Sequence, residues 1–241
     1  MDRETGANFW GRTFEDIFEA YMNHNDCYDE AKMVSYYDLL PEGTYCFCND
    51  KIDITVKTGD IVVDAGSWIG EFAAYASVKG AITYAFEPSK AMYNYLLKTA
   101  KLNPNIYPAQ KGLGAEKFIA TLSEDEIARA GSAIVIERSS FFPEQNSVEM
   151  TTIDAFVEEN NLKRVDFIKA DIEGYERYML EGAKETLKKF APKLAICTYH
   201  RKDDPQVLAK IIQEANPAYY ILQKRKKLYA AIPENRKTMT R

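Results

Sequence analysis

Apolar and polar positions follow two alternating rhythms from residue 61 onward. Short apolar runs have the length and β-branched content of buried strands, and they occur at 61–64, 82–87 and 106–110. Between them, residues 70–78 carry apolar side chains at helical spacing. Ser89 is suited to cap a second helix, which Asn103-Pro104 must end. Strand–helix alternation at this spacing predicts a parallel sheet with right-handed crossovers and helices on both faces.

The same alternation returns after residue 164. Apolar runs predict strands at 165–171 and 194–199 with a helix at 175–189 between them. Another helix is expected to begin at Asp204-Pro205, with Asp204 as its cap and proline at the first helical position. Two closing runs flank basic turn residues and predict an antiparallel hairpin of 219–223 and 228–231. The fold class is therefore α/β: a Rossmann-like, doubly wound sheet of seven strands, mostly parallel, with a C-terminal antiparallel hairpin.

Two regions depart from this alternation. Residues 9–40 have helical spacing and end at Pro41-Glu42-Gly43, so we expect an N-terminal helical cap region, 1–50, ahead of a main domain, 51–241. A short strand pair, 45–47 and 52–56, leads into the sheet. The rhythm breaks again between 114 and 150, which we interpret as an insertion. Its expected elements are strands at 117–122 and 133–137 and a short helix with Ser123 and Glu126 spaced as a capping box.

Composition limits the class of protein. The chain has 241 residues, 46% hydrophobic and 28% charged, with a net charge of −5, which is typical of a globular protein and argues against non-specific binding to nucleic acid or anionic membranes. Basic clusters at 224–227 and 236–241 are interpreted as a solvated turn and tail. No apolar stretch is long enough to span a membrane, and the polar N-terminus lacks a signal-peptide pattern, so a cytoplasmic location is expected. The four cysteines have no metal-binding spacing and are expected to be reduced thiols.

The first candidate site follows two neighbouring strands. Asp64 ends one apolar strand, the turn after it contains Gly66 and Gly70, and Glu87 ends the next strand. Glycines at such a turn let helix amides approach a ligand, and an ionised carboxylate at a strand end can accept hydrogen bonds from both ribose hydroxyls. These residues predict a site for an adenosine-type cofactor.

The spacing of the turn separates two cofactor classes. A dinucleotide fingerprint requires glycine at positions 66, 68 and 71, whereas this chain has Gly66, Trp68 and Glu71. A tryptophan blocks the approach of a pyrophosphate, and the carboxylate of Glu71 would repel one. NAD and FAD are therefore disfavoured, and S-adenosylmethionine, which has a ribose and an amino-acid cation but no phosphate, fits better.

Several segments carry a family resemblance. They are Val-Asp-Ala-Gly-Ser-Trp-Ile-Gly (63–70), Phe-Glu-Pro (86–88), Thr-Thr-Ile-Asp-Ala-Phe (151–156) and, most specifically, Val-Asp-Phe-Ile-Lys-Ala-Asp-Ile-Glu-Gly-Tyr-Glu (165–176) followed by Leu-Glu-Gly-Ala (180–183). Over about residues 52–199 the chain resembles the FkbM-type family of class I S-adenosylmethionine-dependent methyltransferases. The resemblance implies O-methylation of a hydroxyl on a sugar or secondary metabolite.

The resemblance also assigns cofactor residues. It implies that Asp64, Gly66 and Gly70 surround the methionine part of the cofactor and that Glu87 binds the ribose. The remaining residues expected at the cofactor are Ser67, Trp68 and Pro88. Trp68 departs from the small or amide residue usual in the family, so a polar contact to the methionine end is in doubt there.

A second candidate site lies at the ends of later strands. Asp171 ends one strand and His200 the next, so both are expected at the carboxyl edge of the sheet. His200 as base, or Asp171 as base or metal ligand, would suit proton removal from a hydroxyl during methyl transfer. Glu173 joins them as a catalytic candidate, and Asp171 with Glu173 could hold a divalent cation. For Glu176 we prefer a structural role, as a negative charge at the start of a helix.

Other interpretations stay open at this point. A non-catalytic adenosyl-binding module, docking through its N-terminal region, would bind the cofactor without turnover. A nicotinamide-dependent reductase on the same fold is disfavoured by positions 66, 68 and 71, and nucleic-acid methylation by the net charge. Residues 139–142 are expected to contribute to a substrate pocket or its lid. A small-molecule or glycan substrate is expected, but the sequence identifies neither the acceptor nor the oligomeric state.

Overall fold

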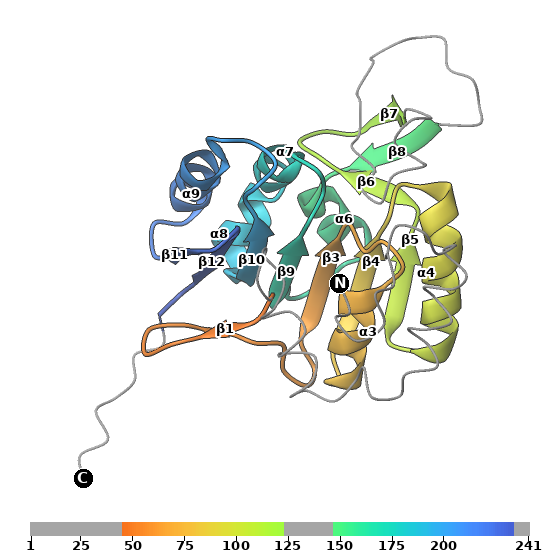
Figure 1. Ribbon diagram of the computed structural model, residues 1–241, viewed down its shortest axis with the longest axis horizontal. Coiled ribbons are helices and arrows are strands. Elements are labelled where there is room, and N and C mark those ends of the chain that lie inside the picture. Colours follow the sequence, from red (N-terminus) through yellow and green to blue (C-terminus); the bar gives the residue numbers. More distant parts are fainter. Residues whose placement is uncertain (1–44, 123–146, 234–241) are drawn as a thin grey trace, which may run out of the picture.

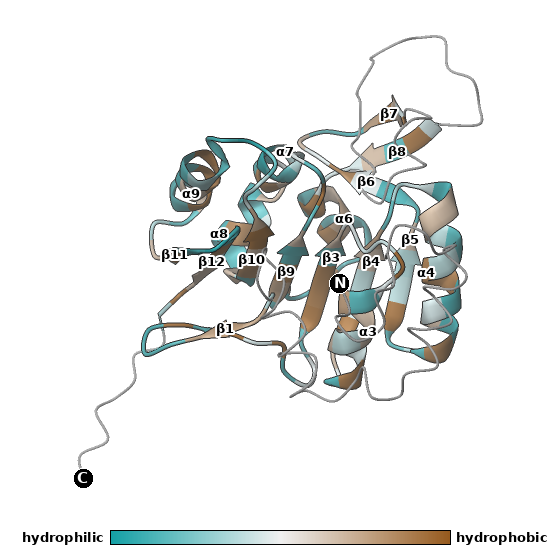
Figure 2. Ribbon diagram, in the orientation of Figure 1, coloured by the Kyte–Doolittle hydropathy of each residue, from teal (hydrophilic) through white to brown (hydrophobic). Residues whose placement is uncertain are grey.

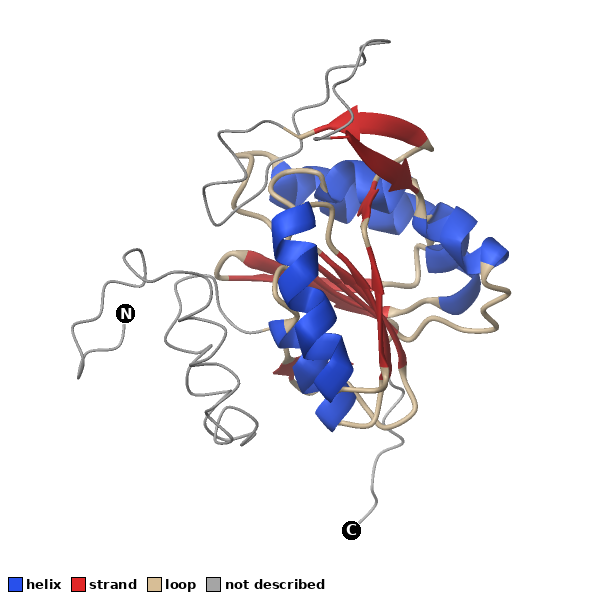
Figure 3. Ribbon diagram, turned by 90° about the vertical axis from the view of Figure 1, so that its right-hand side faces the viewer, coloured by secondary structure: helices blue, strands red, loops and turns tan. Residues whose placement is uncertain are grey.

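The computed structural model describes residues 45–122 and 147–233, and a seven-stranded sheet with helices on both faces lies at its centre (Figures 1 and 3). The strand order is β11-β12-β10-β9-β3-β4-β5. The strands of this sheet are β3 (Ile61–Ala65), β4 (Ile82–Phe86), β5 (Ile106–Ala109), β9 (Phe167–Ala170), β10 (Lys193–Cys197), β11 (Tyr220–Lys224) and β12 (Lys227–Ala231). The helices are α3 (Glu71–Val78), α4 (Lys90–Leu102), α6 (Ile153–Glu159), α7 (Glu176–Glu181), α8 (Lys184–Phe190) and α9 (Asp204–Ala215).

The pairing confirms the predicted fold class. The five strands from β10 to β5 run parallel, whereas β12 pairs antiparallel with β10 and with β11. Parallel strands have their carboxyl ends at one edge of the sheet, and β3 there lies between β4 and β9. From β3 the chain adds β4 and β5 on one side, and later adds β9 and β10 on the other side. A ligand is expected at the carboxyl edge where the direction of strand addition changes in this way.

Burial explains why these segments are strands. The central strands are buried on both faces, as helix-covered parallel strands must be, and all four residues of β9 are buried. Figure 2 shows hydrophobic residues along β3 and on the inner side of α9. The predicted N-cap is also confirmed, because the Ser89 side chain accepts a hydrogen bond from the backbone N–H of Met92 at the start of α4.

The region between β5 and β9 contributes a second, smaller sheet. Its three strands have the order β6-β8-β7 and are β6 (Lys111–Leu113), β7 (Phe118–Thr121) and β8 (Ser147–Thr151). Strand β7 confirms the prediction at 117–122. Two strands of this sheet were not predicted: β6, which is only three residues long, and β8, whose buried and exposed residues mostly alternate. The predicted strand at 133–137, the Ser123–Glu126 capping box and residues 139–142 lie outside the described residues.

A short pair of strands lies ahead of the main sheet. The predicted pair is present as strands β1 (Phe47–Cys48) and β2 (Asp53–Ile54), which are shorter than predicted and run antiparallel. The predicted helices at 9–40 lie outside the described residues, so the cap region 1–50 stays a prediction. The described cysteines Cys46, Cys48 and Cys197 form no disulfide with one another.

The single helix predicted at 175–189 is wrong, because the chain breaks at Gly182 into α7 and α8. A Cβ at Gly182 would lie 2.1 Å from the carbonyl oxygen of Gly114, so only glycine allows this contact with the smaller sheet. The Asp154 carboxylate then accepts hydrogen bonds from the backbone N–H groups of Glu185 and Thr186 and caps α8. The helix therefore ends at Gly182 because of a contact with Gly114, which is distant in sequence.

Helix α9 begins at Asp204, one residue earlier than predicted, with Asp203 rather than Asp204 as its N-cap residue. The side chain of Asp204 serves a different purpose from capping its own helix. It is fully buried, accepts a hydrogen bond from the backbone N–H of Arg201, and forms an ion pair with Arg177 at 2.5 Å.

The turn between β11 and β12 is only partly the solvated basic segment that was predicted. Lys224, Arg225 and Lys226 are exposed, but Lys227 is 1% exposed. Lys227 opens β12 opposite Cys197, and its ammonium lies 4.1 Å from the centre of the Tyr45 ring. Among the described residues, no helix has the length and apolar character that a membrane span requires.

Candidate functional site

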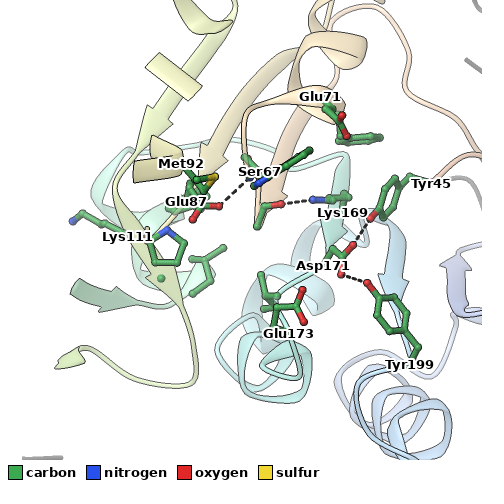
Figure 4. Close-up of a pocket in the computed structure, with 18 residues that line it drawn as sticks. Tyr45, Ser67, Glu71, Glu87, Met92, Lys111, Lys169, Asp171, Glu173 and Tyr199 are labelled. Atoms are coloured by element: carbon green, nitrogen blue, oxygen red, sulfur yellow. Dashed lines mark hydrogen bonds between the residues drawn. The ribbon is translucent and has the colours of Figure 1, made fainter. Parts of the chain in front are cut away.

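A pocket of about 250 Å³ opens at the carboxyl edge of the main sheet (Figure 4). Its walls come from the turns that follow β3, β4 and β9, from the end of β10, from β6, and from the segment ahead of β1. The lining residues are Tyr45, Gly66, Ser67, Trp68, Glu71, Phe72, Phe86, Glu87, Pro88, Met92, Lys111, Gly112, Leu113, Lys169, Asp171, Ile172, Glu173 and Tyr199. Most of the residues that the sequence singles out meet here, although they are spread over more than 100 positions.

Gly66 holds the turns after β3, β4 and β9 together. Its backbone is in the left-handed region, with φ at 73°, and a Cβ there would lie 2.0 Å from the carbonyl oxygen of Asp171. The backbone N–H groups of Gly66 and Ser67 donate to the carbonyl oxygen of Phe86. A side chain at Gly66 would therefore push apart the two turns that form the floor of the pocket.

Gly70 has a different surrounding. Its φ is 94°, and a Cβ would lie 2.9 Å from a methyl group of Leu96 and 3.0 Å from one of Thr99, both on α4. Gly70 is not among the lining residues, and its observed contact is the close packing of the start of α3 against α4.

Glu87 lies in the pocket wall with its carboxylate held by the backbone. It is 5% exposed, and its oxygens accept hydrogen bonds from the backbone N–H groups of Trp68 (2.9 Å) and Ser89 (2.8 Å). Burial raises the pKa of the Glu87 carboxyl to about 7, against the opposing effect of these two donors. The carboxylate therefore changes charge close to neutral pH.

Glu71 and Trp68 also line the pocket. Burial raises the pKa of the Glu71 carboxyl to about 7, and the nearby ammonium of Lys169 only partly opposes this. Trp68 has a left-handed backbone conformation, with φ at 51°, and its backbone N–H points toward the Glu87 carboxylate. The pocket thus contains a second titrating carboxyl at the position where a dinucleotide site would need glycine.

Asp64 is fully buried beneath the pocket and does not line it. Its carboxylate lies 3.0 Å from the ammonium of Lys169, which also donates to the carbonyl oxygens of Gly66 (2.5 Å) and Ala65 (3.3 Å). Burial would lower the pKa of Lys169, but Asp64 and Asp171 outweigh it and raise that pKa. Asp64 therefore acts on the pocket through Lys169, a residue that the sequence analysis missed; a lysine within an apolar strand was the available signal.

Asp171 is the centre of the second candidate site. It accepts hydrogen bonds from the hydroxyl of Tyr45 (2.6 Å) and from that of Tyr199 (2.9 Å), as Figure 4 shows. Burial would raise the pKa of Asp171, but the ammonium of Lys169 and the hydrogen bond from Tyr45 outweigh it, so the pKa lies below its usual range. Asp171 is therefore ionised at neutral pH. Neither tyrosine was predicted as a site residue.

His200 lies behind Asp171, outside the pocket lining. Its Nδ1 is 3.0 Å from Glu176, and its Nε2 is 3.3 Å from Glu173 and 3.6 Å from Asp171. Burial would lower the pKa of His200, but the carboxylates of Glu173 and Glu176 outweigh it and raise that pKa to about 10. His200 is therefore an imidazolium at neutral pH and has no lone pair with which to accept a proton.

Glu176 has more than the helix-terminus role preferred from the sequence. It is fully buried, and besides approaching His200 it accepts a hydrogen bond from the backbone N–H of Ile172. This bond stabilises the turn in which Glu173 takes a left-handed backbone, with φ at 54°. Oxygen and nitrogen atoms of Asp171, Glu176 and His200 all lie within 4.8 Å of one another, so the same cluster has the ligand types of a metal site.

The charged side chains that line the pocket can be compared with the charges of S-adenosylmethionine. Among the lining residues, the carboxylates of Glu71, Glu87, Asp171 and Glu173 outnumber the ammonium groups of Lys111 and Lys169. The cofactor carries a sulfonium and an ammonium against a single carboxylate, so its net positive charge suits this surplus of acid. Glu87 additionally offers an acceptor for ribose hydroxyls. The residues present fit this group.

Comparisons with known proteins agree with one another. Residues 60–221 match the methyltransferase FkbM domain family. A curated relative, the hexuronic acid methyltransferase AglP of Haloferax volcanii, is 26% identical over 157 residues, which cover 65% of this chain and 62% of that protein. The chain thus spans less than two thirds of the length of this relative.

A solved structure supports the fold. The crystal structure of methyltransferase FkbM from Methylobacillus flagellatus KT superimposes with a TM-score of 0.54 at 24% sequence identity, over 71% of this chain and 43% of that chain.

Proposed function

Because the chain belongs to the methyltransferase FkbM domain family, we propose that it is an S-adenosylmethionine-dependent methyltransferase that methylates an oxygen atom of a sugar. The observation that carries the proposal is the acid-rich pocket at the β3–β4–β9 edge, with Glu87 in its wall. The sugar acceptor is supported by the Haloferax volcanii relative, which is named for a hexuronic acid.

The proposed cofactor site uses the residues around the first turn. Glu87 accepts hydrogen bonds from the ribose hydroxyls, while Gly66, Ser67 and Trp68 form the backbone wall beside it. Pro88 adds an apolar surface next to Glu87. Asp64 and Gly70 act indirectly, through Lys169 and through the packing of α3 on α4.

Methyl transfer needs an aligned acceptor oxygen and a destination for its proton. When bound, the cofactor supplies an electrophilic methyl on a sulfonium sulfur, which keeps the electron pair of the broken C–S bond and becomes a neutral thioether. Asp171 accepts a hydrogen bond from the acceptor hydroxyl in place of Tyr199 and takes the proton as the new C–O bond forms. The proton then passes to water at the mouth of the pocket. Positioning contributes much of the acceleration in such a step.

His200 positions Asp171 and Glu173 in this mechanism and does not act as the base. Its imidazolium faces both carboxylates from Nε2, while the buried Glu176 holds Nδ1. Of the two bases considered from the sequence, the proposal therefore retains Asp171. Glu173, 33% exposed at its side chain, lies beside the acceptor position.

A divalent cation is not needed for this proposal. The carboxylates of Asp171, Glu173 and Glu176 already face the cationic imidazole of His200, and a metal ion would have to displace its proton. Activity that persists in excess EDTA supports the metal-free mechanism, and activity that is lost and then restored by Mg²⁺ or Mn²⁺ contradicts it.

Calorimetric titration with S-adenosylhomocysteine tests the cofactor site. We expect binding by the wild type, and about tenfold weaker binding by Glu87→Gln because a charged acceptor is lost. Glu158→Gln, which removes an exposed carboxylate on α6, is the matched control and should bind like the wild type. No binding by the wild type, or equal binding by Glu87→Gln, would contradict the cofactor assignment.

Turnover is measured separately, as S-adenosylhomocysteine released with a panel of hexuronic acids, neutral hexoses and non-sugar hydroxyls. Cofactor binding without methylation of any acceptor would favour the non-catalytic binding module. The cytoplasmic location and the absence of a nucleic-acid partner stay predictions, which cell fractionation and a filter-binding assay would test.

A further inference from the structure

Among the described residues, two tyrosines bond to opposite oxygens of the Asp171 carboxylate. The hydroxyl of Tyr45 donates to Oδ2 at 2.6 Å, and the hydroxyl of Tyr199 donates to Oδ1 at 2.9 Å (Figure 4). Nε2 of His200 also faces Oδ1, at 3.6 Å. The two oxygens of the proposed base therefore have different surroundings, and the two tyrosines need not have the same role.

Three of the described elements hold the ring of Tyr45. Its centre lies 5.5 Å from the ring centre of Phe72 on α3, in an edge-on contact. The ammonium of Lys227 on β12 lies 4.1 Å from the centre of the Tyr45 ring, and that of Lys169 on β9 lies 5.3 Å from it. Both lysines are buried, so water does little to weaken their attraction to the ring. Tyr45 is therefore fixed by packing and charge as well as by its hydrogen bond.

Tyr199 occupies a more open place at the other oxygen. It follows the end of β10, lines the pocket, and is 37% exposed. A hydrogen bond from a hydroxyl to a carboxylate is strongest at about 2.5–2.7 Å, so the 2.9 Å bond from Tyr199 is the weaker of the two. An entering hydroxyl can therefore displace Tyr199 more easily than Tyr45.

The orientation of the Asp171 carboxylate depends on these donors. Rotation about the last side-chain bond of an aspartate has broad, roughly two-fold preferences, so the side chain alone does not fix where each oxygen points. Methyl transfer requires the acceptor oxygen in line with the sulfonium methyl, and a misplacement of about 1 Å can cost about a hundredfold in rate. A donor that stays on one oxygen keeps the other oxygen directed at the acceptor.

We propose that Tyr45 is a positioning residue for methyl transfer, which holds Oδ2 of Asp171 so that Oδ1 receives the hydroxyl of the sugar. This inference rests on the proposed function and assigns a further residue within it. Tyr199 occupies the place of the acceptor hydroxyl in the free protein and leaves it when the acceptor binds. The acceptor proton passes to Oδ1 as the C–O bond forms, and Tyr45 keeps its own proton.

The kinetics of Tyr45→Phe test this role, because the variant keeps the ring and removes only the hydroxyl. With the acceptor of highest kcat/KM among the hexuronic acids and neutral hexoses, kcat should fall about tenfold to a hundredfold. The KM for that acceptor and the Kd for S-adenosylhomocysteine should stay within about twofold of the wild type, because the hydroxyl bonds to Asp171 and to neither ligand. An unchanged kcat, or a loss confined to KM, would overturn the proposal.

Tyr199→Phe should change a different kinetic constant. Without the Tyr199 hydroxyl, the acceptor no longer has to break a hydrogen bond to reach Oδ1 of Asp171. Its KM should therefore fall about fivefold, as the net free energy of one hydrogen bond implies. A loss of kcat as large as that of Tyr45→Phe would overturn the division of roles between the two tyrosines.

Tyr219 provides the matched control for the loss of a buried hydroxyl. It is 4% exposed, and its hydroxyl donates to the carbonyl oxygen of Pro192 at 2.7 Å. Pro192 precedes β10, so this bond lies at the edge of the sheet opposite the pocket. Tyr219→Phe should lose thermal stability but keep the wild-type kcat. If it lost as much kcat as Tyr45→Phe, general destabilisation would explain both losses and the proposal would be wrong.

Crystal structures of the Tyr45 and Tyr199 variants with S-adenosylhomocysteine test the proposal without turnover. We expect Asp171 to keep its side-chain torsions in Tyr199→Phe, because Tyr45 still holds Oδ2, and to rotate or adopt two conformers in Tyr45→Phe. An unaltered Asp171 in Tyr45→Phe would overturn the inference and leave the methyltransferase assignment intact. Failure of the wild type to bind S-adenosylhomocysteine would instead contradict the proposed function itself, and this inference with it.

Discussion

The fully buried carboxylate of Glu176 lies 3.0 Å from Nδ1 of His200, and this contact determines what His200 can do. A carboxylate on one side of the ring turns the other ring nitrogen toward Asp171 and Glu173. The same negative charges keep the ring protonated. His200, which the sequence suggests as a base, is therefore a positively charged group at neutral pH.

The charge of His200 predicts a specific pH dependence of stability. Because its pKa rises from the usual 6.5 to about 10 in the folded state, the protonated ring stabilises the fold fully below pH 6.5, and this contribution is lost as the pH rises through 10. The difference in unfolding free energy between the wild type and His200→Gln should therefore shrink between pH 7 and pH 10.5.

An NMR titration measures the same property directly. The ring signals of His200, assigned by their absence in His200→Gln, should not titrate until above pH 9, and Glu176→Gln should move the midpoint toward the usual value. A wild-type titration midpoint near pH 6.5 would contradict the conclusion that His200 is protonated at neutral pH.

Cofactor affinity should depend on pH through Glu87. With a pKa of about 7, this carboxyl is increasingly protonated below neutrality, and only the ionised form accepts hydrogen bonds from both ribose hydroxyls. We expect the Kd for S-adenosylhomocysteine to fall as the pH rises from 5.5 to 8, by about fivefold to tenfold, and to level off above pH 8. Glu87→Gln should lose most of this dependence; an unchanged pH profile in that variant would assign it to another group, with Glu71 the first to examine.

The buried pair of Asp64 and Lys169 should show strong coupling. Removing either partner leaves an uncompensated charge with 5% or less of its side chain exposed, which costs about 3–5 kcal/mol. Removing both avoids that penalty, so Asp64→Asn/Lys169→Met should lose much less stability than the sum of the single variants. Urea unfolding of the four proteins completes the double-mutant cycle, and additive losses would show that the two side chains do not interact.

Two glycines with similar backbones provide a matched test of the turn after β3. Gly59 and Gly66 both have positive φ, 81° and 73°, but a Cβ at Gly59 would meet nothing within 4 Å, whereas one at Gly66 would meet the Asp171 carbonyl at 2.0 Å. Gly59→Ala should cost about 1 kcal/mol from backbone strain alone and leave cofactor binding unchanged.

Gly66→Ala should cost about 3 kcal/mol or more and weaken S-adenosylhomocysteine binding strongly, because the turns after β3 and β9 must separate. Thermal unfolding and calorimetry on both variants make the comparison. Similar losses at the two positions would mean that the contact with Asp171 is unimportant.

The sequence predicts the parts of this site that follow from strand ends. Asp64, Glu87 and Asp171 could be placed at one edge because parallel strands bring their carboxyl ends together, whatever the details of packing. His200 could be placed near them for the same reason, but its charge could not. That charge depends on the burial of Glu176, which sequence spacing alone assigns to a helix terminus.

Other features depend on contacts between distant segments. Tyr45 reaches Asp171 across 126 positions, and the break at Gly182 depends on Gly114. Lys227 was grouped with its basic neighbours because charge runs are usually solvated, whereas pairing with β10 draws it inward. Only the tertiary arrangement distinguishes it from Lys226.

The position of Tyr45 has a consequence for which residues a fragment with an intact pocket must contain. The family match covers residues 60–221, yet Tyr45 donates a hydrogen bond to Asp171 from ahead of that range, and β12, which separates β10 from β11, lies after it. A fragment trimmed to the matched residues would lose a hydroxyl from the site and leave β10 as an open sheet edge, prone to pair with other chains. A fragment that keeps both the Tyr45–Asp171 hydrogen bond and the β10–β12 pairing must therefore extend beyond residues 60–221 at both ends.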